Sequence, residues 1–411
     1  MKRRVVITGM GALSPIGNTV EEMWAAARAG QCGIDLIKGF DTAEHKVKVA
    51  GELKGFDITD HMDKMSARRT ARFTQLALVA AREAFVQSGL DMSKENAARC
   101  GVNISSGIGG LPTIEEEHYK GIKRGFDKVS PLFVPMAISN MAAGTVAIEF
   151  GFKGSCTCVV TACASGTNAI GEAFRQIRDG YADVFLTGGS ESCISELGIG
   201  GFTSMKALSE SQNPKRASIP FDRERNGFVM GEGAGVLLLE SYDHAVARGA
   251  EILCEIAGYG VSCDANHMTA PLEDGSGAAA CMSSALEDAG VSADQVGYIN
   301  AHGTSTPMND RCETLAVKTA FGASAGNLLM SSTKSMTGHL LGASGAVEAV
   351  LTVKALQDDF APPTIGYREA DPDCDLDIVA NAGREMDTDY AMSNSLGFGG
   401  HNASILFRRV K

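Results

Sequence analysis

A cysteine at residue 163 and two histidines far downstream have the side chains and surroundings that nucleophilic chemistry requires. The apolar, β-branched run before Cys163 predicts a buried strand over Cys158–Ala162. Apolar residues at helical spacing after it predict a helix over Asn168–Arg178. A thiol at the start of a helix lies at the positive end of the helix dipole, which favours the thiolate that attacks carbonyl carbon. We therefore expect Cys163 to accept an acyl group, although a lone cysteine is more often a small core residue.

The two histidines lie where α/β proteins commonly bind ligands. His302 follows the strand-like run Val296–Asn300 and opens a loop rich in hydroxyl side chains. Ligands of open α/β sheets bind beyond the carboxyl ends of strands. His339 precedes a Gly/Ala-rich helical segment, and a neutral histidine there can polarise an oxygen. Each histidine alone could simply bond its own loop, but together with Cys163 they predict a second step in which negative charge develops.

Lys334 follows the strand-like run Leu328–Ser332 and lies five residues before His339. Alone, it could be an exposed lysine, since most lysines are. Its position in the same segment as a candidate histidine favours a role in the site.

Two other patterns suggest cofactors and are better explained without them. Gly9-x-Gly11 follows a strand-like run, but the dinucleotide-binding fingerprint needs a third small residue where Ser14 stands, directly before a proline. A tight turn is the better interpretation. Cys156-x-Cys158 has neither a Cys-x-x-Cys partner nor paired histidines, so this pattern does not indicate a metal site.

The composition narrows the class of protein. A net charge of −12 argues against general affinity for nucleic acid or anionic membranes. No segment is apolar for the length of a membrane span, and the short apolar run near the start predicts a first strand, not a signal peptide. The cysteine count of 11 is odd and the spacing irregular, so we expect reduced thiols in a cytoplasmic enzyme.

Strand and helix signals alternate along the chain, which predicts an α/β fold. The predicted strands are Arg4–Thr8, Cys158–Ala162, Val184–Thr187, Val236–Glu240, Val296–Asn300, Leu328–Ser332 and Ala403–Phe407. The predicted helices are Phe73–Ser88, Asn168–Arg178, Ala278–Ala289 and Val347–Gln357.

A weak internal duplication divides the chain into two halves. Ala164–Gly166 before one helix is echoed by Ala343–Gly345 before another, and Ala84–Gly107 is echoed by Ala285–Gly303. The echoes are too far apart for a solenoid repeat. We expect halves at residues 1–249 and 250–411, with the cysteine in the first and both histidines in the second, so that the site forms where they meet.

Four segments carry a resemblance to a known family: Thr161–Gly166, Ala301–Thr306, Lys334–His339 and Gly397–Asn402. They resemble the signatures of the elongating β-ketoacyl-[acyl-carrier-protein] synthases of bacterial type II fatty acid synthesis, and the match extends over nearly the whole chain. The resemblance implies a thiolase-like α/β fold, five-layered α/β/α/β/α, made of two duplicated halves, and a homodimer. Asn226 stands where relatives often have Asp, outside these segments.

The family's activity is a decarboxylative Claisen condensation, which lengthens a fatty acyl chain by two carbons. The resemblance implies that Cys163 takes the acyl chain from one acyl carrier protein and that malonyl-carrier protein then loses CO2. The backbone N–H groups of Cys163 and Phe398 would form the oxyanion hole. His302 and His339 would donate hydrogen bonds to the enolate oxygen.

Supporting and substrate-binding roles are implied in the same way. Lys334 would organise charge near His339, with Glu348 as its acidic partner because an unpaired buried ammonium is costly. Substrate contacts are implied for Ile108, Thr304, Thr306, Phe398 and Gly399. Among these, the threonines would hold the phosphopantetheine arm and Ile108 would line the acyl tunnel. No cofactor or metal is implied, because phosphopantetheine arrives on the carrier protein.

An acidic carrier protein needs a local basic patch on this acidic chain. We expect that patch at Lys64, Arg68, Arg69, Arg72 and Lys206, although runs of charge are often only solvated helix faces.

Three alternatives share parts of this pattern. A polyketide-type ketosynthase and the shorter-range elongating isozyme have the same fold and catalytic residues. A non-catalytic chain-length subunit would lack Cys163. A biosynthetic thiolase would carry a second cysteine, and initiating synthases an asparagine, in place of His339.

Overall fold

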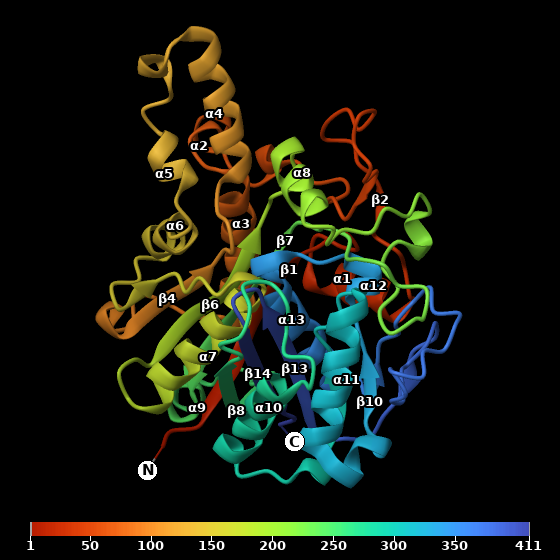
Figure 1. Ribbon diagram of the computed structural model, residues 1–411. Coiled ribbons are helices and arrows are strands. Elements are labelled where there is room, and N and C mark those ends of the chain that lie inside the picture. The colour runs from red at the N-terminus through yellow and green to blue at the C-terminus, as the bar shows by residue number, and fades with distance from the viewer. Residues whose placement is uncertain (1, 411) are drawn as a thin grey trace.

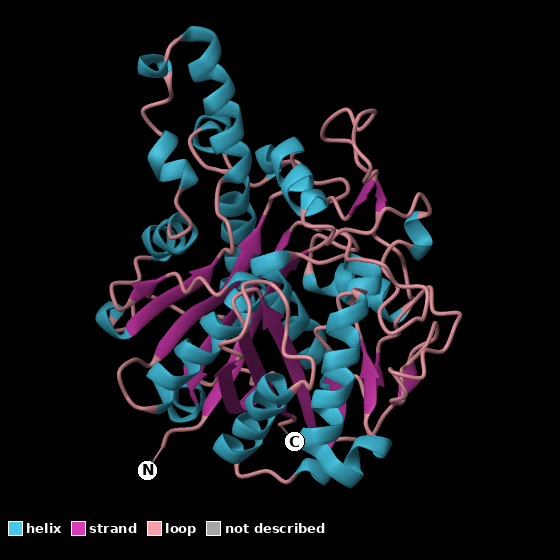
Figure 2. Cartoon of the chain, in the orientation of Figure 1, coloured by secondary structure: helices cyan, strands magenta, loops and turns pink. Residues whose placement is uncertain are grey.

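The computed structural model describes residues 2–410, in which ten strands form one mixed sheet in the order β10-β9-β13-β14-β8-β1-β7-β6-β4-β5 (Figures 1 and 2). In chain order these strands are β1 (Val5–Leu13), β4 (Cys100–Ser105), β5 (Cys156–Thr157), β6 (Val184–Glu191), β7 (Gly233–Ser241), β8 (Cys254–Cys263), β9 (Val296–Asn300), β10 (Leu329–Ser331), β13 (Tyr390–Gly397) and β14 (His401–Arg408). Two small hairpin-like sheets join β2 (Asp35–Leu36) to β3 (Val49–Ala50) and β11 (Phe360–Ala361) to β12 (Arg384–Glu385).

The sheet consists of two halves with the same topology. They join where β1 pairs with β8 in antiparallel register, with Val5 opposite Ile256. Outward from this junction the strands run β1-β7-β6-β4-β5 on one side and β8-β14-β13-β9-β10 on the other. In each half the first two neighbouring pairs are antiparallel and the outer two are parallel. The predicted duplication is therefore confirmed, while the junction at residue 249 stays a prediction.

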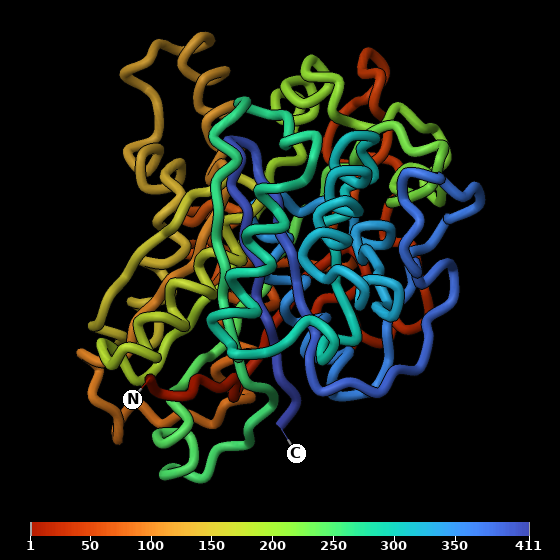
Figure 3. Tube along the Cα trace, turned by 60° about the horizontal axis from the view of Figure 1, so that its bottom comes forward, coloured from red at the N-terminus to blue at the C-terminus, as the bar shows by residue number. Residues whose placement is uncertain are grey.

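The helices form three layers around these two half-sheets. The inner layer consists of α7 (Ser165–Arg178) and α13 (Ser344–Gln357), which contact each other and the strands of both halves. The first half is covered outside by α3 (Arg72–Ser88) and α6 (Met141–Phe150), and the second by α10 (Ser276–Ala289) and α11 (Pro307–Phe321). In Figure 3 the teal helix α10 crosses the blue strands of the second half. This is the predicted α/β/α/β/α arrangement.

The remaining helices lie outside these layers. They are α1 (Val20–Arg28), α2 (Lys64–Arg68), α4 (Leu111–Arg124), α5 (Phe133–Ala137), α8 (Glu196–Ser204), α9 (Tyr242–Arg248) and α12 (Lys334–Thr337). Figure 1 shows α4 and α5 as an arm that projects from the body beside α2. Across residues 2–410, every helix is too short or too polar to cross a membrane.

Local sequence accounts for the two helices that matter most to the layers. The outer helix α3 buries an alanine-rich face on the sheet and ends at Gly89, whose left-handed backbone (φ +62°) caps it. The central helix α13 is buried over nearly its whole surface, as expected for an apolar helix between two half-sheets.

One predicted strand is wrong. Only Cys156–Thr157 pairs with β4, and the segment Cys158–Ala162 is irregular. The N–H of Val159 donates to the Ser105 side chain (3.1 Å), and Ala162 adopts φ +49°, which is incompatible with a strand. A tight turn therefore replaces the end of the strand.

Candidate active site

Cys163 lies in a turn that leads into the inner helix α7. The turn is a short 3₁₀ segment, Ala162–Ala164, and α7 begins at Ser165. The Ser165 hydroxyl accepts from the Thr161 N–H (2.9 Å) and donates to the Ala162 carbonyl (2.6 Å). These bonds hold the strained backbone of Ala162, so the turn presents the cysteine at the helix start. The thiol is almost fully buried, with Cys163 8% exposed.

The backbone around Phe398 approaches the same turn. A Cβ on Gly397 would lie 2.7 Å from the Thr161 carbonyl oxygen and 3.2 Å from the Cys163 nitrogen, so only glycine fits there. The backbone N–H groups of Phe398 and Cys163 both reach the sulfur and act to lower its pKa. Two N–H groups converging on one point have the arrangement of an oxyanion hole.

Burial, however, decides the protonation state of Cys163. Loss of solvent raises the pKa of the Cys163 thiol to about 12, although the positive charge of Lys334 acts in the opposite direction. The N–H groups at the helix start favour the thiolate, as expected, but the loss of solvent outweighs them. A pKa of about 12 favours the protonated thiol.

The two histidines approach each other from separate elements of the second half. Their ring centroids lie 5.3 Å apart at an interplanar angle of 85°. The His302 N–H and the next N–H, that of Gly303, each donate at 2.8 Å to the buried carboxylate of Glu313. The His339 N–H donates to the Val229 carbonyl at 2.7 Å.

Hydrogen bonding also limits which ring nitrogens can reach a substrate. Nδ1 of His339 lies 2.8 Å from the Ser344 hydroxyl. Nδ1 of His302 is buried and has no partner among residues 2–410. The nitrogen that each ring can turn to the cavity is therefore Nε2. With the Ser344 hydroxyl as donor, His339 carries its proton on Nε2.

Both histidines are held neutral. Burial lowers the pKa of His302 and of His339 well below the ordinary histidine value, and the charge of Lys334 lowers both further. A neutral imidazole can donate one hydrogen bond to a developing oxyanion without first losing a proton.

Lys334 is buried with its predicted partner. Its ammonium forms an ion pair with the Glu348 carboxylate, and the two side chains are 1% and 4% exposed. Burial raises the pKa of Glu348, whereas the ammonium opposes that rise. Glu348 lies four residues after Ser344, the first residue of α13. The equivalent position in α7, four residues after Ser165, is Ala169. Only the second half carries the pair.

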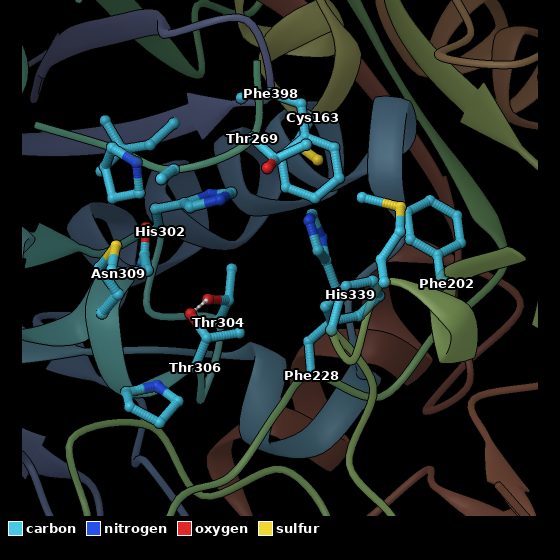
Figure 4. Close-up of a pocket in the computed structure, with 18 of the residues that line it drawn as sticks. Cys163, Phe202, Phe228, Thr269, His302, Thr304, Thr306, Asn309, His339 and Phe398 are labelled. Carbon is cyan, nitrogen blue, oxygen red and sulfur yellow. Dashed lines mark hydrogen bonds between the residues drawn. The ribbon is translucent and has the colours of Figure 1, made fainter. Parts of the chain in front are cut away.

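A cavity of about 370 Å³ collects residues from both halves. It is lined by Cys163, His302, His339, Thr304, Thr306 and Phe398, among others (Figure 4). The hydroxyl oxygens of Thr304 and Thr306 lie 2.9 Å apart on one wall. The rings of Phe202 and Phe228, 5.5 Å apart, form an apolar wall beside His339.

The remaining candidates from the sequence lie around this cavity. Ile108 is outside it, in the apolar cluster that contains Cys163. Gly399 is exposed and its N–H donates to the Met268 carbonyl (2.7 Å), so its backbone ties two loops together. Within residues 2–410 no group of three or more His, Cys, Asp or Glu side chains could hold a metal ion.

The basic residues differ in their availability. Lys64, Arg68 and Arg69 are exposed on or next to α2, and Lys206 is exposed where it lines the cavity. Arg72 forms a bidentate ion pair with the buried Glu232, with both N–O distances 2.7 Å. Its guanidinium therefore stabilises the fold, which argues against the predicted docking role.

Several residues of the site lie outside every motif. Glu313 is fully buried, and that burial raises its pKa to about 7. On the cavity wall, the Asp264 carboxylate accepts a hydrogen bond from the Asn402 amide at 2.7 Å. Phe202 and Phe228 line an aromatic side of the same cavity. A lone acid or phenylalanine gives no local signal in a sequence, so these contacts emerge only from the fold.

Two family models match the chain. The β-ketoacyl synthase N-terminal domain matches residues 2–245 and the β-ketoacyl synthase C-terminal domain matches residues 253–368. Together they cover most of the chain.

Known proteins are similar over the full length. The chain is 52% identical over 409 residues to 3-oxoacyl-[acyl-carrier-protein] synthase 2 of Staphylococcus aureus (strain COL), covering 100% of this chain and 99% of the relative. It is 48% identical over 411 residues to the protein of the same name in Synechocystis sp., again covering 100% and 99%. A solved type II PKS ketosynthase in complex with its acyl-carrier protein superposes with a TM-score of 0.92 at 36% identity, over 100% of both chains.

Proposed function

The chain belongs to the β-ketoacyl synthase family and is a condensing acyltransferase of the 3-oxoacyl-[acyl-carrier-protein] synthase type, and on that premise we propose how its residues divide the reaction. The observation that carries the proposal is a single cavity with a buried thiol from one half and two neutral imidazoles from the other. One half supplies the acyl acceptor, and the other stabilises charge.

In the first step the Cys163 sulfur attacks the thioester of an acyl-carrier protein. The tetrahedral oxyanion accepts hydrogen bonds from the N–H groups of Cys163 and Phe398. The bond to the pantetheine sulfur breaks, and the proton of the neutral thiol ends on that leaving sulfur. The acyl chain then stands on Cys163, in the apolar cluster that also contains Ile108.

In the second step malonyl-carrier protein loses CO2 in the same cavity. The electron pair of the broken C–C bond forms an enolate, whose oxygen accepts hydrogen bonds from Nε2 of His302 and His339. The enolate carbon attacks the acyl carbonyl, the Cys163 thiolate leaves, and it takes up one proton. The product is a 3-oxoacyl chain two carbons longer on the carrier protein. Neither step requires a metal or a cofactor bound by the chain itself.

Lys334 and the threonines support these steps. Burial keeps both histidines neutral, and the charge of the ammonium, itself compensated by Glu348, lowers their pKa values further. The hydroxyls of Thr304 and Thr306 offer hydrogen bonds to the amide groups of the pantetheine arm as it crosses the cavity wall.

Acyl transfer to Cys163 can be tested directly. Long-chain acyl-carrier protein is mixed with the enzyme without malonyl substrate, and the mass of the Cys163 peptide is measured. We expect the mass of one acyl group on that peptide and none in Cys163→Ala. Acylation of another residue, or none at all, would overturn the assignment.

The acyl carrier protein is the proposed partner, docked by exposed basic residues. Figure 1 places α2 and α8 at the same end of the molecule, and Lys206, just beyond α8, lines the cavity. Reversing the charge of Arg68 and Arg69 together should raise KM for carrier-protein substrates while kcat changes little. Lys94→Glu, at an exposed lysine that forms an ion pair with nearby Asp91, is the control. An unchanged KM would remove the docking patch.

We also propose a homodimer, formed over the free edge of the sheet and the projecting arm. β5 is the last strand of the sheet, and large apolar side chains nearby are exposed: Tyr119, Ile122, Phe126, Val134, Ile138, Ile148 and Val160. An unpaired strand edge with exposed apolar residues is a surface that a second copy can cover. Light scattering should give twice the chain mass, and Ile148→Asp should lower it. A monomeric wild-type chain would refute the proposal.

The cytoplasm is the proposed location. All 11 cysteines are free thiols in the structure, and thiols persist in a reducing compartment. Detection of a tagged chain in the separated fractions of lysed cells would test this location, and recovery outside the cytoplasmic fraction would contradict it.

A further inference from the structure

Glu191, the last residue of β6, has a fully buried carboxylate surrounded by hydrogen-bond donors. It accepts from the Ser106 hydroxyl and the Gly107 N–H, both at 2.7 Å, and from the Ile108 N–H at 3.3 Å. It also accepts from the Gly342 N–H at 3.0 Å. In the part of the chain that the structure describes, no lysine or arginine forms an ion pair with it.

These donors belong to opposite halves of the molecule. Residues 106–108 follow β4 in the first half, whereas Gly342 lies in the turn before α13 in the second. The two backbones touch, because a Cβ on Gly342 would lie 2.3 Å from the Gly107 nitrogen. One carboxylate therefore joins the halves beside the catalytic turn.

The duplication explains why the carboxylate fits there. Gly342 lies two residues before α13, as Cys163 lies two residues before α7. The preceding residues, Leu341 and Ala162, have nearly identical left-handed backbones (φ +48° and +49°). At Cys163 the turn presents its N–H to the reacting oxygen. At Gly342 the equivalent N–H is occupied by Glu191.

We propose that Glu191 is a positioning residue for the acyl-transfer step, which holds the Ser106–Ile108 loop against the Gly342 turn and so places Ile108 beside Cys163. This rests on the proposed function of Cys163 as acyl acceptor. Ile108 packs in the same apolar cluster as Cys163, where an acyl chain on the sulfur would lie. A shift of this loop therefore changes the space available to the acyl group.

Charge gives Glu191 a second, measurable effect on the thiol. Two charged groups act on Cys163: Glu191 raises the pKa of the thiol and Lys334 lowers it, while His302 and His339 across the cavity are neutral. Burial raises the pKa of Glu191 itself, and its N–H donors favour the ionised form. The neighbouring Cys193 donates its thiol to the same carboxylate at 3.3 Å, and burial beside Glu191 keeps that thiol protonated.

Neither histidine bonds to Glu191, although Ser344, which holds Nδ1 of His339, lies two residues beyond Gly342. His302 is held by Glu313, and His339 is held by the Val229 carbonyl and the Ser344 hydroxyl. Loss of the Glu191 anchor should therefore affect acyl transfer more than malonyl decarboxylation, and this difference separates a positioning role from general loss of structure.

Glu191→Gln tests the proposal. The amide keeps the size of the side chain, but its NH2 group replaces one of the two accepting oxygens. At the Oε1 position the NH2 group would face the Ile108 N–H, and at the Oε2 position it would face the N–H groups of Gly107 and Gly342, so in either orientation an N–H of the loop loses its acceptor. Acylation of Cys163 by acyl-carrier protein should slow by up to about 10²-fold, the loss that a misplacement of about 1 Å can cause, and decarboxylation should keep most of its rate. Alkylation of Cys163 by iodoacetamide should become faster at each pH below the thiol pKa, because the negative charge is gone.

Two further variants make the test specific. Glu191→Asp keeps the charge but shortens the reach, so it should slow acylation and leave the pH dependence of alkylation unchanged. Glu196→Gln makes the same acid-to-amide change at an exposed site on α8 and should alter neither the acylation nor the alkylation of Cys163.

The outcomes are separable. Wild-type rates of acylation and alkylation in Glu191→Gln, beside an active wild-type enzyme, would overturn the inference alone. Equal losses of acylation and decarboxylation would also overturn it, because they indicate a purely structural role. A wild-type chain that is alkylated at Cys163 but never acylated would overturn the proposed function and this role with it.

Discussion

Breaking the buried ion pair between Lys334 and Glu348 should lower the free energy of unfolding by an amount that follows from the burial of both groups. Both side chains are under 5% exposed, so replacement of one partner leaves the other group buried without compensation, at a cost of about 3–5 kcal/mol. The two single variants are not equivalent. In Lys334→Met the carboxyl of Glu348, whose pKa burial already raises, can take up a proton. In Glu348→Gln the ammonium stays buried, so this variant should be the less stable.

Urea unfolding, followed by the fluorescence of the single, buried Trp24, measures these costs at fixed protein concentration. The double variant Lys334→Met/Glu348→Gln should be more stable than Glu348→Gln by about 2 kcal/mol or more, because no unpaired charge remains. The double variant should be as impaired in malonyl decarboxylation as the variants without Lys334. The acid limb of its pH–rate profile should move to higher pH, because the Lys334 charge that helps burial to lower the pKa values of His302 and His339 is lost. If the double variant loses the sum of the unfolding free energies that the two single variants lose, the coupling between Lys334 and Glu348 is refuted.

Three further predictions concern the reacting groups and a distant histidine. Cys163→Ala should abolish condensation but keep malonyl decarboxylation, because both histidines retain their anchors; normal condensation, measured by product mass, would contradict the mechanism. His339→Ala should lower decarboxylation about 10²–10³-fold, the usual loss for one oxyanion donor, and unchanged CO2 release would remove its role. Hydrogen bonds that the His244 ring donates to the Glu240 and Glu95 carboxylates raise its pKa from 6.5 to about 9. The folded chain thus binds this proton more tightly than the unfolded chain. That stabilisation is complete below pH 6.5 and is lost as the pH rises to about 9, by about 1–2 kcal/mol after screening, since the side chain is 23% exposed. Urea titrations across this interval should show the fall, and an identical slope in His244→Gln would assign it elsewhere.

The parts of the site that the sequence predicts are those whose signals are local. Cys163, His302 and His339 each follow or precede a segment with clear periodicity, so their positions at the ends of elements can be inferred from neighbours. The role of Lys334 and its pairing with Glu348 came from the family resemblance, together with the rule that a buried ammonium needs an acid.

Properties that depend on tertiary packing could not be predicted in this way. Burial, which sets the pKa of the Cys163 thiol, depends on chain segments from both halves. The strand predicted over Cys158–Ala162 does not form, because pairing stops at Thr157 and the turn needs a left-handed backbone at Ala162, of which alanine gives no hint.

Acidic and basic residues gave the least reliable local signals. Glu191 and Glu313 look like surface acids in the sequence, yet both are buried among backbone N–H groups. Arg72 looks like part of an exposed basic run, but its partner Glu232 lies 160 residues away. Such pairings are visible only once the fold brings distant segments together.

The measurement that tests the central claim most directly is the intact mass of the carrier protein after reaction of the enzyme with long-chain acyl-carrier protein and malonyl-carrier protein. The account predicts a 3-oxoacyl chain two carbons longer than the donor chain. Conversion of malonyl- to acetyl-carrier protein alone would show that the histidines act without acyl transfer to Cys163. Unchanged masses, together with condensation of coenzyme A esters, would contradict the account and favour a thiolase.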